Sequence, residues 1–551
     1  MLYTGAEILV KELIKQGVDT VFGYPGGYVI NIYDELFKNQ DKIAHILTAH
    51  EQGAAHAADA YARVSGRTGV VIATGGPGAT NLITGIANAY LDSVPVVFIT
   101  GNVAVPMLGQ DSFQDIDIAG VTLPIVKHSY VVKDVRNLQK IINEAFFIAG
   151  SDRKGPVHID IPKNVQTDTS DYSQSSLKFT AKNIIRVDED EINKAVSLIE
   201  KSNRPYIYCG GGVTATDTGL YVMQLSKKIN APIGTSLMGI GSVPCSFDMN
   251  LGMSGMFGRY ASIMAKSEAD LIIALGVRFS DRATGNANEY ATNTAVIHID
   301  IDAAELSKNI KPNVGICGNL KDILPLLLNK VQIKQNNQWF KRIKELQKKD
   351  LYSPDNNFTP QNIINIVKTY CNDDTVITTD VGQHQMWVAQ HYKFEKPRKL
   401  ISSGGLGAMG YGLGAAIGAS IAQGRKRTVL FTGDGSFGMN LTELATVVSF
   451  KLPVLIILMN NNSLGMVRQW QTLFYDKRYS NTTLNRKTDF PAIAKAFGVE
   501  GFYASNLDEL ESALGKTPEE RPCLIECKID IDENVFPMIP AGKTIADVIF
   551  E

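Results

Sequence analysis

The sequence has few cysteines and no excess of charge of either sign, and it lacks a long apolar run. Its 551 residues include 54 basic and 56 acidic residues, which leave a formal net charge of -2. This balance gives no electrostatic basis for binding nucleic acid or an anionic membrane. No apolar run reaches the roughly 18 residues of a spanning helix, and no secretory signal begins the chain. We therefore expect a cytoplasmic protein without nucleic-acid or membrane partners.

The six cysteines are scattered and do not form a zinc-binding pattern. Cys523 and Cys527 are spaced C-x3-C, but no further Cys or His follows at a suitable distance. We interpret all of them as buried free thiols, which suits a reducing compartment. The six are Cys209, Cys245, Cys317, Cys371, Cys523 and Cys527.

Short β-rich apolar runs alternate with helical stretches along the whole chain. Thr4 and Glu7 have the spacing of a capping box and predict a helix that ends near Gly17. Continuous apolar strands between helices indicate parallel sheets that are covered on both faces. The fold class we predict is α/β, with three doubly wound parallel-sheet domains. Polar stretches at residues 170–176 and 335–359 divide the chain into domains at 1–170, 185–335 and 360–545.

The most specific motif is Gly433-Asp434-Gly435-Ser436, followed by Asn460-Asn461. We expect strands at 428–432 and 454–459 with a helix at 439–450 between them, which places both polar clusters at the carboxyl ends of neighbouring parallel strands. Mg2+ prefers oxygen ligands, and Asp434, Asn461 and the carbonyl of Ser463 can supply them. Gly433 and Gly435 let the main chain approach a phosphate, to which Ser436 can donate. The alternative is a tight turn next to a polar loop.

With a spacing of 27 positions from Asp434 to Asn461, this motif resembles that of thiamine-diphosphate enzymes. The resemblance makes domain 360–545 the diphosphate and Mg2+ domain and domain 1–170 the pyrimidine-binding domain. It also makes Glu51 the acid-base partner of the cofactor's aminopyrimidine ring. The alternative for Glu51 is a carboxylate that merely complements a helix dipole. Because such enzymes build each cofactor site from two subunits, we expect at least a homodimer.

Further segments resemble the catalytic large subunits of the acetohydroxyacid synthase (acetolactate synthase) family, over nearly the whole chain. They are residues 22–27, 74–81, 111–115, 381–387, 403–410 and 534–540. The resemblance implies that Gln383, His384 and Ser436 hold the diphosphate and that Met409 lies under the bent cofactor, although an apolar residue there could simply be core. The other implied contacts to this cofactor are Gly26, Gly27, Pro77, Asn81, Gly407, Gly433, Gly435, Met466 and Val467.

The same resemblance assigns residues to the substrates. Phe113, Gln114 and Lys127 would lie near the reacting carbon and its entrance. Arg282 would bind the carboxylate of the acceptor 2-oxo acid, since guanidinium suits bidentate carboxylate binding. Trp470 and Met256 would line the acceptor pocket. A solvated arginine and a core tryptophan are the alternatives.

The central domain, 185–335, resembles an FAD-binding domain. Gly210-Gly211-Gly212 follows a predicted strand and satisfies a loose G-x-G-x-x-A template, which is weak evidence alone. The resemblance adds contacts at Leu237, Met238, Gly276, Arg278 and Asp300, and it implies a structural flavin. Phe257 and Asn319 depart from the family's usual His and Asp.

The predicted function is that of an acetolactate synthase. It decarboxylates pyruvate and condenses the two-carbon unit with pyruvate or 2-oxobutanoate, which gives 2-acetolactate or 2-aceto-2-hydroxybutanoate for branched-chain amino acid biosynthesis. The alternatives are a pyruvate oxidase, another thiamine-diphosphate lyase or hydrolase, and a scaffold without turnover. A dimer or tetramer, and a small regulatory subunit, both stay open.

Overall fold

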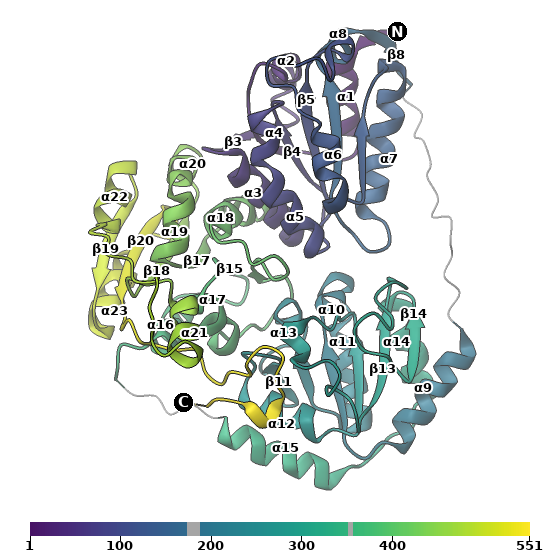
Figure 1. Cartoon of the computed structure of the whole chain (residues 1–551), viewed down its shortest axis with the longest axis vertical. Helices are drawn as coiled ribbons and strands as arrows, with labels where there is room; N and C mark the ends of the chain where they lie inside the picture. Colours follow the sequence, from purple (N-terminus) through teal and green to yellow (C-terminus); the bar gives the residue numbers. More distant parts are fainter. Residues whose placement is uncertain (174–187, 351–355, 551) are drawn as a thin grey trace.

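The computed structural model describes residues 1–173, 188–350 and 356–550, and within these it contains three six-stranded parallel sheets. Each sheet forms a separate α/β domain (Figure 1). Apolar side chains from both faces of each sheet are buried under helices. The predicted fold class, three doubly wound parallel-sheet domains, is confirmed.

The first domain has the strand order β3-β2-β4-β5-β7-β6. Thr4 and Glu7 form the predicted capping box, and helix α1 ends at Lys15. A short antiparallel pair, β1 (Leu2–Thr4) and β8 (Thr169–Asp171), closes the domain. Its sheet strands are β2 Thr20–Tyr24, β3 Ala44–Leu47, β4 Gly69–Ala73, β5 Val96–Asn102, β6 His128–Val131 and β7 Val157–Pro162. Its helices are α1 Gly5–Lys15, α2 Ile30–Lys38, α3 Glu51–Ser65, α4 Pro77–Asn81, α5 Ile83–Leu91, α6 Ile118–Thr122, α7 Leu138–Gly150 and α8 Lys163–Thr167.

The central domain has the strand order β11-β10-β9-β12-β13-β14. Its strands are β9 Pro205–Cys209, β10 Ile233–Thr235, β11 Asn250–Met253, β12 Leu271–Leu275, β13 Ala295–Asp300 and β14 Val314–Cys317. Its helices are α9 Glu189–Lys201, α10 Gly211–Thr216, α11 Gly219–Ile229, α12 Tyr260–Glu268, α13 Asp281–Thr284, α14 Leu320–Lys330 and α15 Asn337–Lys349.

The third domain has the strand order β16-β15-β17-β18-β20-β19. The helix predicted at 439–450 is wrong in its bounds: α19 already begins at Asp434, and a 3-10 turn separates it from α20. The strands are β15 Val376–Thr379, β16 Leu400–Ile401, β17 Thr428–Gly433, β18 Val454–Asn460, β19 Glu500–Ala504 and β20 Cys523–Lys528. The helices are α16 Pro360–Thr369, α17 Gln383–His391, α18 Tyr411–Ala422, α19 Asp434–Asn440, α20 Leu444–Ser449, α21 Gly465–Phe474, α22 Phe490–Phe497 and α23 Leu507–Lys516.

The first and third domains are joined by helices α3 and α18, which pack along each other at the centre of Figure 1. Small residues allow the two backbones to touch. A Cβ atom on Gly418 would lie 1.9 Å from the Ala57 carbonyl oxygen, and one on Gly414 would lie 2.9 Å from that of Gly53. Residues of both domains therefore share one buried apolar cluster.

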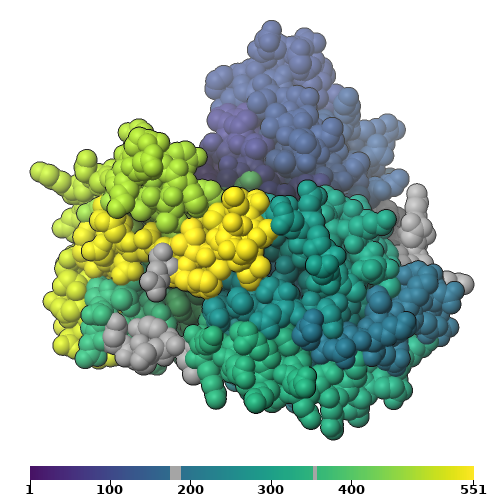
Figure 2. Space-filling model, turned by 60° about the horizontal axis from the view of Figure 1, so that its bottom comes forward, coloured from purple at the N-terminus to yellow at the C-terminus, as the bar shows by residue number. Residues whose placement is uncertain are grey.

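The carboxyl-terminal segment leaves the third domain and crosses onto the central one, where it forms the yellow band in Figure 2. The Ile539 N–H donates to the Met256 carbonyl at 2.8 Å, and the Asn286 N–H donates to the Lys543 carbonyl at 3.0 Å. This segment thus fixes the central-domain loops that carry Met256 and the end of α13.

Two sequence expectations need correction or fall outside the described residues. Cys245 is exposed and Cys317 and Cys371 are half-buried, so only Cys209, Cys523 and Cys527 are buried thiols. The start predicted for the second domain, at residue 185, lies outside the described residues, as do parts of both polar stretches, 170–176 and 335–359. Within the described ranges, no helix is long and apolar enough to cross a membrane.

Candidate active site

The Asp434 carboxylate lies at the carboxyl end of β17, beside the residues that follow β18. Its Oδ1 atom is buried without a hydrogen-bond partner, and burial raises the pKa of Asp434 to about 6. Asn461 is buried too, and its Oδ1 accepts from the Ser463 N–H at 3.1 Å. A buried carboxylate oxygen without a partner requires an explanation, and a hard cation beside amide and main-chain oxygens supplies one.

No cluster of three or more His, Cys, Asp or Glu side chains suited to a metal occurs in the part of the chain that the structure describes. A cation at Asp434 would therefore depend on one carboxylate together with the oxygens of Asn461 and Ser463. Such a ligand set suits Mg2+, which shares its coordination with phosphate oxygens, better than Zn2+, which favours nitrogen and sulfur ligands.

A cradle for an anion surrounds Asp434. A Cβ atom on Gly433 would lie 3.0 Å from the His384 ring, and one on Gly465 would lie 1.9 Å from Oε1 of Gln383, so a side chain at either position would require His384 or Gln383 to shift. The His384 Nε2 atom is buried without a partner, and burial lowers the pKa of His384 to about 3. A neutral imidazole with a free nitrogen and the amino terminus of α19 are suited to a phosphate group.

The loop between β16 and α18 carries Gly407 and Met409. Gly407 has φ 68° and Gly410 has φ 85°, both in the left-handed region that favours glycine. The Asp380 carboxylate, which follows β15, accepts from the Gly410 N–H at 2.8 Å. Met409 approaches the glycines of α19, since its Cε lies 3.7 Å from a Cβ atom placed on Gly435. The predicted Met409 position thus adjoins the predicted diphosphate cradle.

Glu51 begins helix α3 at the carboxyl end of the first sheet, as expected of a residue that follows β3. Its Oε2 accepts from the Asn81 amide at 3.0 Å, and a Cβ atom on Gly78 would lie 3.1 Å from its Oε1. Gln114 adjoins the same region, since a Cβ atom on Gly76 would lie 2.7 Å from its Cβ. The structure therefore brings Glu51, Asn81, Pro77 and Gln114 together at the carboxyl end of the sheet.

The other residues predicted for the first domain are less close together. The Tyr28 hydroxyl donates to the Phe113 carbonyl at 2.5 Å, which ties the 111–115 loop to the loop of Gly26 and Gly27, but the Phe113 side chain is 80% exposed. Lys127 precedes β6 and donates to the carbonyl oxygens of Ile148 and Ser151, so it lies at the amino end of the parallel sheet. Within one chain, Lys127 and Glu51 are at opposite ends of that sheet.

The three residues predicted to contact the acceptor substrate lie together. The Arg282 guanidinium is 6.0 Å from the Trp470 ring centroid, and its Nη1 is 3.7 Å from the Met256 sulfur. Met256 is also bonded through its N–H to the Arg282 carbonyl at 2.8 Å. The cluster joins α13 of the central domain to α21 of the third domain, which also carries Met466 and Val467.

The predicted flavin residues converge at the carboxyl end of the central sheet. Gly210 and Gly276 are packed backbone to backbone, since a Cβ atom on Gly210 would lie 1.9 Å from the Gly276 carbonyl oxygen. Burial raises the pKa of Asp300, at the end of β13, to about 6, and the hydroxyl of Thr235, at the end of β10, is buried without a partner. Arg278 donates to the Leu91 carbonyl, and Met238 adjoins Gly404. Gly211 and Gly212 begin α10, and Leu237 begins the following 3-10 turn.

The two departures from the family pattern have local explanations. Phe257 is buried in the apolar cluster that contains Trp387 and Val388. Asn319 caps α14, where its side-chain oxygen accepts from the Lys321 N–H at 2.9 Å. Orphaned polar atoms and glycine-restricted backbone in this domain fit a polar cofactor such as FAD.

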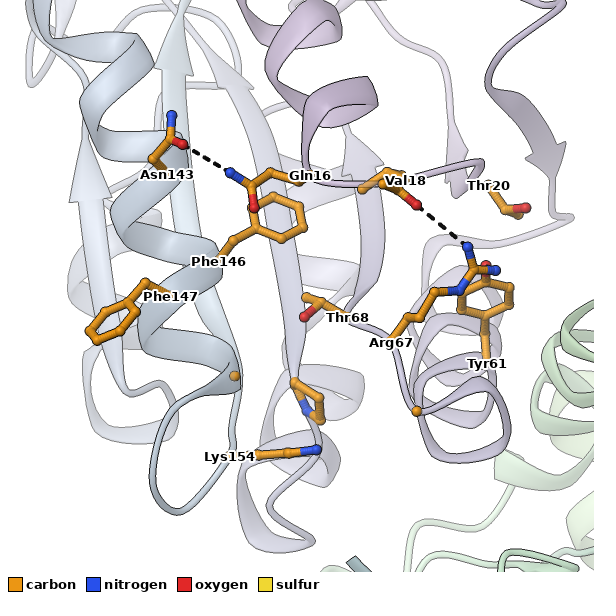
Figure 3. A pocket seen from close by; sticks show the side chains of 14 residues that line it. Gln16, Val18, Thr20, Tyr61, Arg67, Thr68, Asn143, Phe146, Phe147 and Lys154 are labelled. Carbon is orange, nitrogen blue, oxygen red and sulfur yellow. Dashed lines mark hydrogen bonds between the residues drawn. The ribbon is translucent and has the colours of Figure 1, made fainter. Parts of the chain in front are cut away.

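A separate cavity of about 680 Å3 lies at the amino ends of the first domain's strands (Figure 3). Thr68 precedes β4 and Pro95 precedes β5, and the other wall comes from Phe146 of α7. Because Glu51 lies at the carboxyl end of the same sheet, this cavity is not part of the candidate site.

Three residues that sequence reasoning missed hold the site together. Asp380 supports the Gly410 turn, Glu443 accepts main-chain hydrogen bonds at the start of α3, and Asp92 accepts from the N–H groups of Gly404 and Gly405. Only Asp380 carried a usable signal, because it directly precedes Val381-Gly382-Gln383 at the end of a predicted strand.

Comparison with known proteins shows which families this chain resembles. Three family models match the chain: the N-terminal TPP binding domain of thiamine pyrophosphate enzymes at residues 3–121, their central domain at 192–327 and their C-terminal TPP binding domain at 380–527. The acetolactate synthase large subunit of Lactococcus lactis is 41% identical, over 98% of this chain and 95% of its own length. The acetolactate synthase isozyme 2 large subunit of Escherichia coli is 42% identical over 99% of both chains. The acetolactate synthase large subunit of Porphyra purpurea is 43% identical over 99% of this chain and 95% of its own.

Proposed function

This chain belongs to the thiamine pyrophosphate enzymes and, within them, to the acetolactate synthase large subunits, and from that membership we propose that it condenses the two-carbon unit of pyruvate with a second 2-oxo acid. The observation that carries the proposal is the Arg282, Met256 and Trp470 cluster, which combines a cation for a carboxylate with an apolar wall. The acceptor would be pyruvate or 2-oxobutanoate, and the product would be 2-acetolactate or 2-aceto-2-hydroxybutanoate.

Thiamine diphosphate, when bound, supplies the electron sink for the loss of CO2 from pyruvate. Asp434, Asn461 and Ser463 would hold Mg2+, and Gln383, His384 and Ser436 would hold the diphosphate. Glu51 would exchange a proton with the aminopyrimidine ring, as a general acid and base. Support comes from the buried Asp434 Oδ1 without a partner and from the close approach of Gly433 and Gly465 to His384 and Gln383.

Arg282 would bind the acceptor carboxylate through its fork of N–H donors. Among the described residues, its only ion-pair partner is the exposed Asp281 at 3.7 Å, which leaves the guanidinium available to a substrate. Trp470 and Met256 would surround the acceptor side chain. Gln114 and Phe113 would bound the reacting carbon, whereas Lys127 of the same chain lies at the opposite end of the first sheet from Glu51.

We further propose that the active site forms between two copies of this chain. Glu51 and Asp434 belong to different domains, and apolar side chains next to each half are exposed, among them Phe113 at 80% and Val467 at 52%. Each half exposes more than one such side chain, with Met107 in the loop of Phe113 and Phe474 on the helix of Val467, and exposed apolar patches mark interaction sites. A second copy would cover both halves in one closed, two-fold arrangement. Sedimentation of the protein with and without its cofactors would measure the oligomeric state.

FAD is proposed as a structural group in the central domain, held by the glycines 210–212 and 276, by Leu237, Met238 and Arg278 and by Asp300. The relatives are named large subunits, and that name supports a smaller partner subunit for this chain. Co-expression with a candidate small subunit, followed by purification through a tag on one partner, would test the association.

Product analysis tests the proposed function. The purified protein is incubated with pyruvate, 2-oxobutanoate, Mg2+, thiamine diphosphate and FAD, first under nitrogen and then in air. We expect acetohydroxyacids at the same rate in both gases. Acetate or acetyl phosphate together with peroxide, formed only in air, would instead establish a pyruvate oxidase.

A further inference from the structure

Glu443 is a buried carboxylate of the third domain that bonds to the main chain of the first. It ends the 3-10 turn after α19 and has no exposed surface. Its Oε1 accepts from the His50 N–H at 3.0 Å, and its Oε2 accepts from the Ala49 N–H at 3.1 Å. The Thr446 hydroxyl donates to Oε2 at 2.6 Å. Each carboxylate oxygen thus bonds to one of two consecutive amides.

These amides immediately precede Glu51, which is the first residue of α3. The amino terminus of a helix carries unsatisfied N–H groups and a partial positive charge, so a carboxylate there is stabilised. The His50 side chain already caps the helix by accepting from the Gln52 N–H at 3.0 Å. Glu443 therefore adds a second cap, from another domain, one residue before the predicted acid-base group.

The contact is close enough to restrict the sequence of α3. A Cβ atom on Gly53 would lie 2.0 Å from Oε1 of Glu443, so any other residue at position 53 would displace this carboxylate. The backbone of α18 also approaches Gly53, since a Cβ atom on Gly414 would lie 2.9 Å from the Gly53 carbonyl oxygen. The first turn of α3 is thus confined by the third domain on two sides.

Among the described residues, Glu443 forms no salt bridge, and burial raises the pKa of its carboxyl above the ordinary value although its hydrogen bonds oppose the shift. Hydrogen bonds from two main-chain amides and one hydroxyl, rather than a cation, stabilise the group. Its function is therefore one of orientation: two oxygens bound to two consecutive N–H groups fix both the position and the rotation of the helix start.

We propose that Glu443 is a positioning residue that sets the orientation of Glu51 from across the interface between the first and third domains. It does not contact the reacting atoms. The proposal rests on the role of Glu51 in the proposed function, and it identifies the third domain as part of the machinery that holds the acid-base group of the same chain.

A first experiment examines the protein without cofactors. Hydrogen–deuterium exchange, read by mass spectrometry on peptides that span residues 47–54, compares the wild type with Glu443→Gln. The amide group cannot accept two N–H bonds in the same way, so we expect exchange at Ala49 and His50 to become at least about tenfold faster. Glu12→Gln is the matched control. Glu12 is also fully buried, and its carboxylate accepts hydrogen bonds from the side-chain amides of Gln139 and Asn143.

A second experiment measures the rate at which the bound cofactor exchanges its thiazolium proton for deuterium, by rapid quench and NMR. This rate depends on the acid-base group and not on any substrate. With Glu443→Gln we expect a fall of roughly tenfold to hundredfold, the size that a displacement of about 1 Å produces, whereas the Kd of Mg2+ and thiamine diphosphate changes less than about threefold. Gly53→Ala approaches the same contact from the helix side and should give the same result.

Wild-type exchange rates in both variants, in either experiment, would overturn the positioning role. Equal losses in Glu12→Gln would also overturn it, because they would indicate general destabilisation. If Glu443→Gln does not fold, Gly53→Ala decides. A wild-type protein that exchanges the thiazolium proton but forms no acetohydroxyacid would refute the proposed function and leave the role of Glu443 standing.

Discussion

The Arg282 guanidinium lies 6.0 Å from the centre of the Trp470 ring, although the two residues come from different domains. Arg282 is held by α13, whose neighbouring loop is bonded to the carboxyl-terminal segment at Lys543, and Trp470 is held by α21. A cation next to an aromatic face defines one wall for a carboxylate and one for an apolar side chain. This relationship is the basis of the first prediction.

Replacement of Trp470 by Leu should change the choice of acceptor. The flat wall against an ethyl group is lost, so the preference for 2-oxobutanoate over pyruvate should fall by roughly tenfold or more, which corresponds to the 1–3 kcal/mol range of a single methylene. The product ratio from a mixture of both acids measures it. Phe474→Leu is the control, since the Phe474 ring packs edge-on against the Trp470 ring, with 5.4 Å between the two ring centroids. An unchanged ratio in Trp470→Leu would remove Trp470 from the acceptor pocket.

Glu51→Gln should abolish most turnover. General acid-base groups contribute on the order of 10²–10⁴-fold, so kcat should fall by at least about a hundredfold. Because Asp434, Asn461 and His384 are on another domain, the Kd of Mg2+ and thiamine diphosphate should stay near the wild-type value, as measured by quenching of tryptophan fluorescence. Near-normal turnover in this variant would show that another group carries the proton.

The cofactor-free protein should become more stable when Asp434 is replaced by Asn. Burial raises the pKa of Asp434 to about 6 from its ordinary 3.8, so the folded state holds this proton more tightly than the unfolded state does. The stability that this provides is complete below pH 3.8 and is lost as the pH rises through about 6. At pH 8 we expect a higher Tm for cofactor-free Asp434→Asn than for the wild type, and below pH 4 no difference.

The same pKa predicts the pH dependence of metal binding. Mg2+ competes with the proton on Asp434, so its Kd should rise as the pH falls below about 6. Calorimetric titration with Mg2+ and thiamine diphosphate between pH 5 and 8 would measure this, and Asp434→Asn should show no tight Mg2+ binding at any pH. A flat pH profile would mean that Asp434 does not bind the ion.

Asp92→Asn should weaken both the fold and the loop of Met409. Asp92 is buried, and it accepts from Arg63 at 2.9 Å and from the N–H groups of Gly404 and Gly405 at 3.0 and 2.7 Å. Breaking a buried ion pair costs on the order of 3–5 kcal/mol, so we expect a clear fall in Tm and weaker cofactor binding.

The matched control for this change is Asp134→Asn, which removes a half-buried carboxylate that pairs with the exposed Arg136 at the surface. We expect it to leave both Tm and cofactor affinity unchanged, because exposed ion pairs contribute little. If Asp92→Asn lowers Tm but not cofactor affinity, the loop does not depend on this anchor.

Much of the architecture could be predicted from the sequence, because apolar runs and glycine-rich turns are local signals. The strands before Asp434 and Asn461 were expected within a residue or two of β17 and β18, and parallel neighbours bring their carboxyl ends together by geometry. The sequence predicts too late a start for α19, because Asp434 and Gly435 are weak helix formers. In the fold, β17 and the N-cap residue Gly433 fix the first turn of this helix at Asp434.

What could not be predicted depends on contacts distant in sequence. Glu443 bonds to amides almost 400 positions earlier in the chain, and no composition or spacing marks a main-chain acceptor of this kind. Cys245 was expected to be buried but lies at the surface between two domains. The family resemblance places Lys127 with Gln114. Only the direction of β6 shows that Lys127 lies before the amino end of this strand and not after its carboxyl end.

The packing of α3 along α18 has a consequence for synthesis of the chain. About 350 residues separate the end of α3 from the start of α18, so at a typical 5–20 residues per second the first domain waits on the order of twenty seconds to a minute before its partner helix emerges. During that time Ala57 and the neighbouring small residues of α3 are not buried by α18. The nascent amino-terminal domain is therefore a natural client for chaperones on the ribosome.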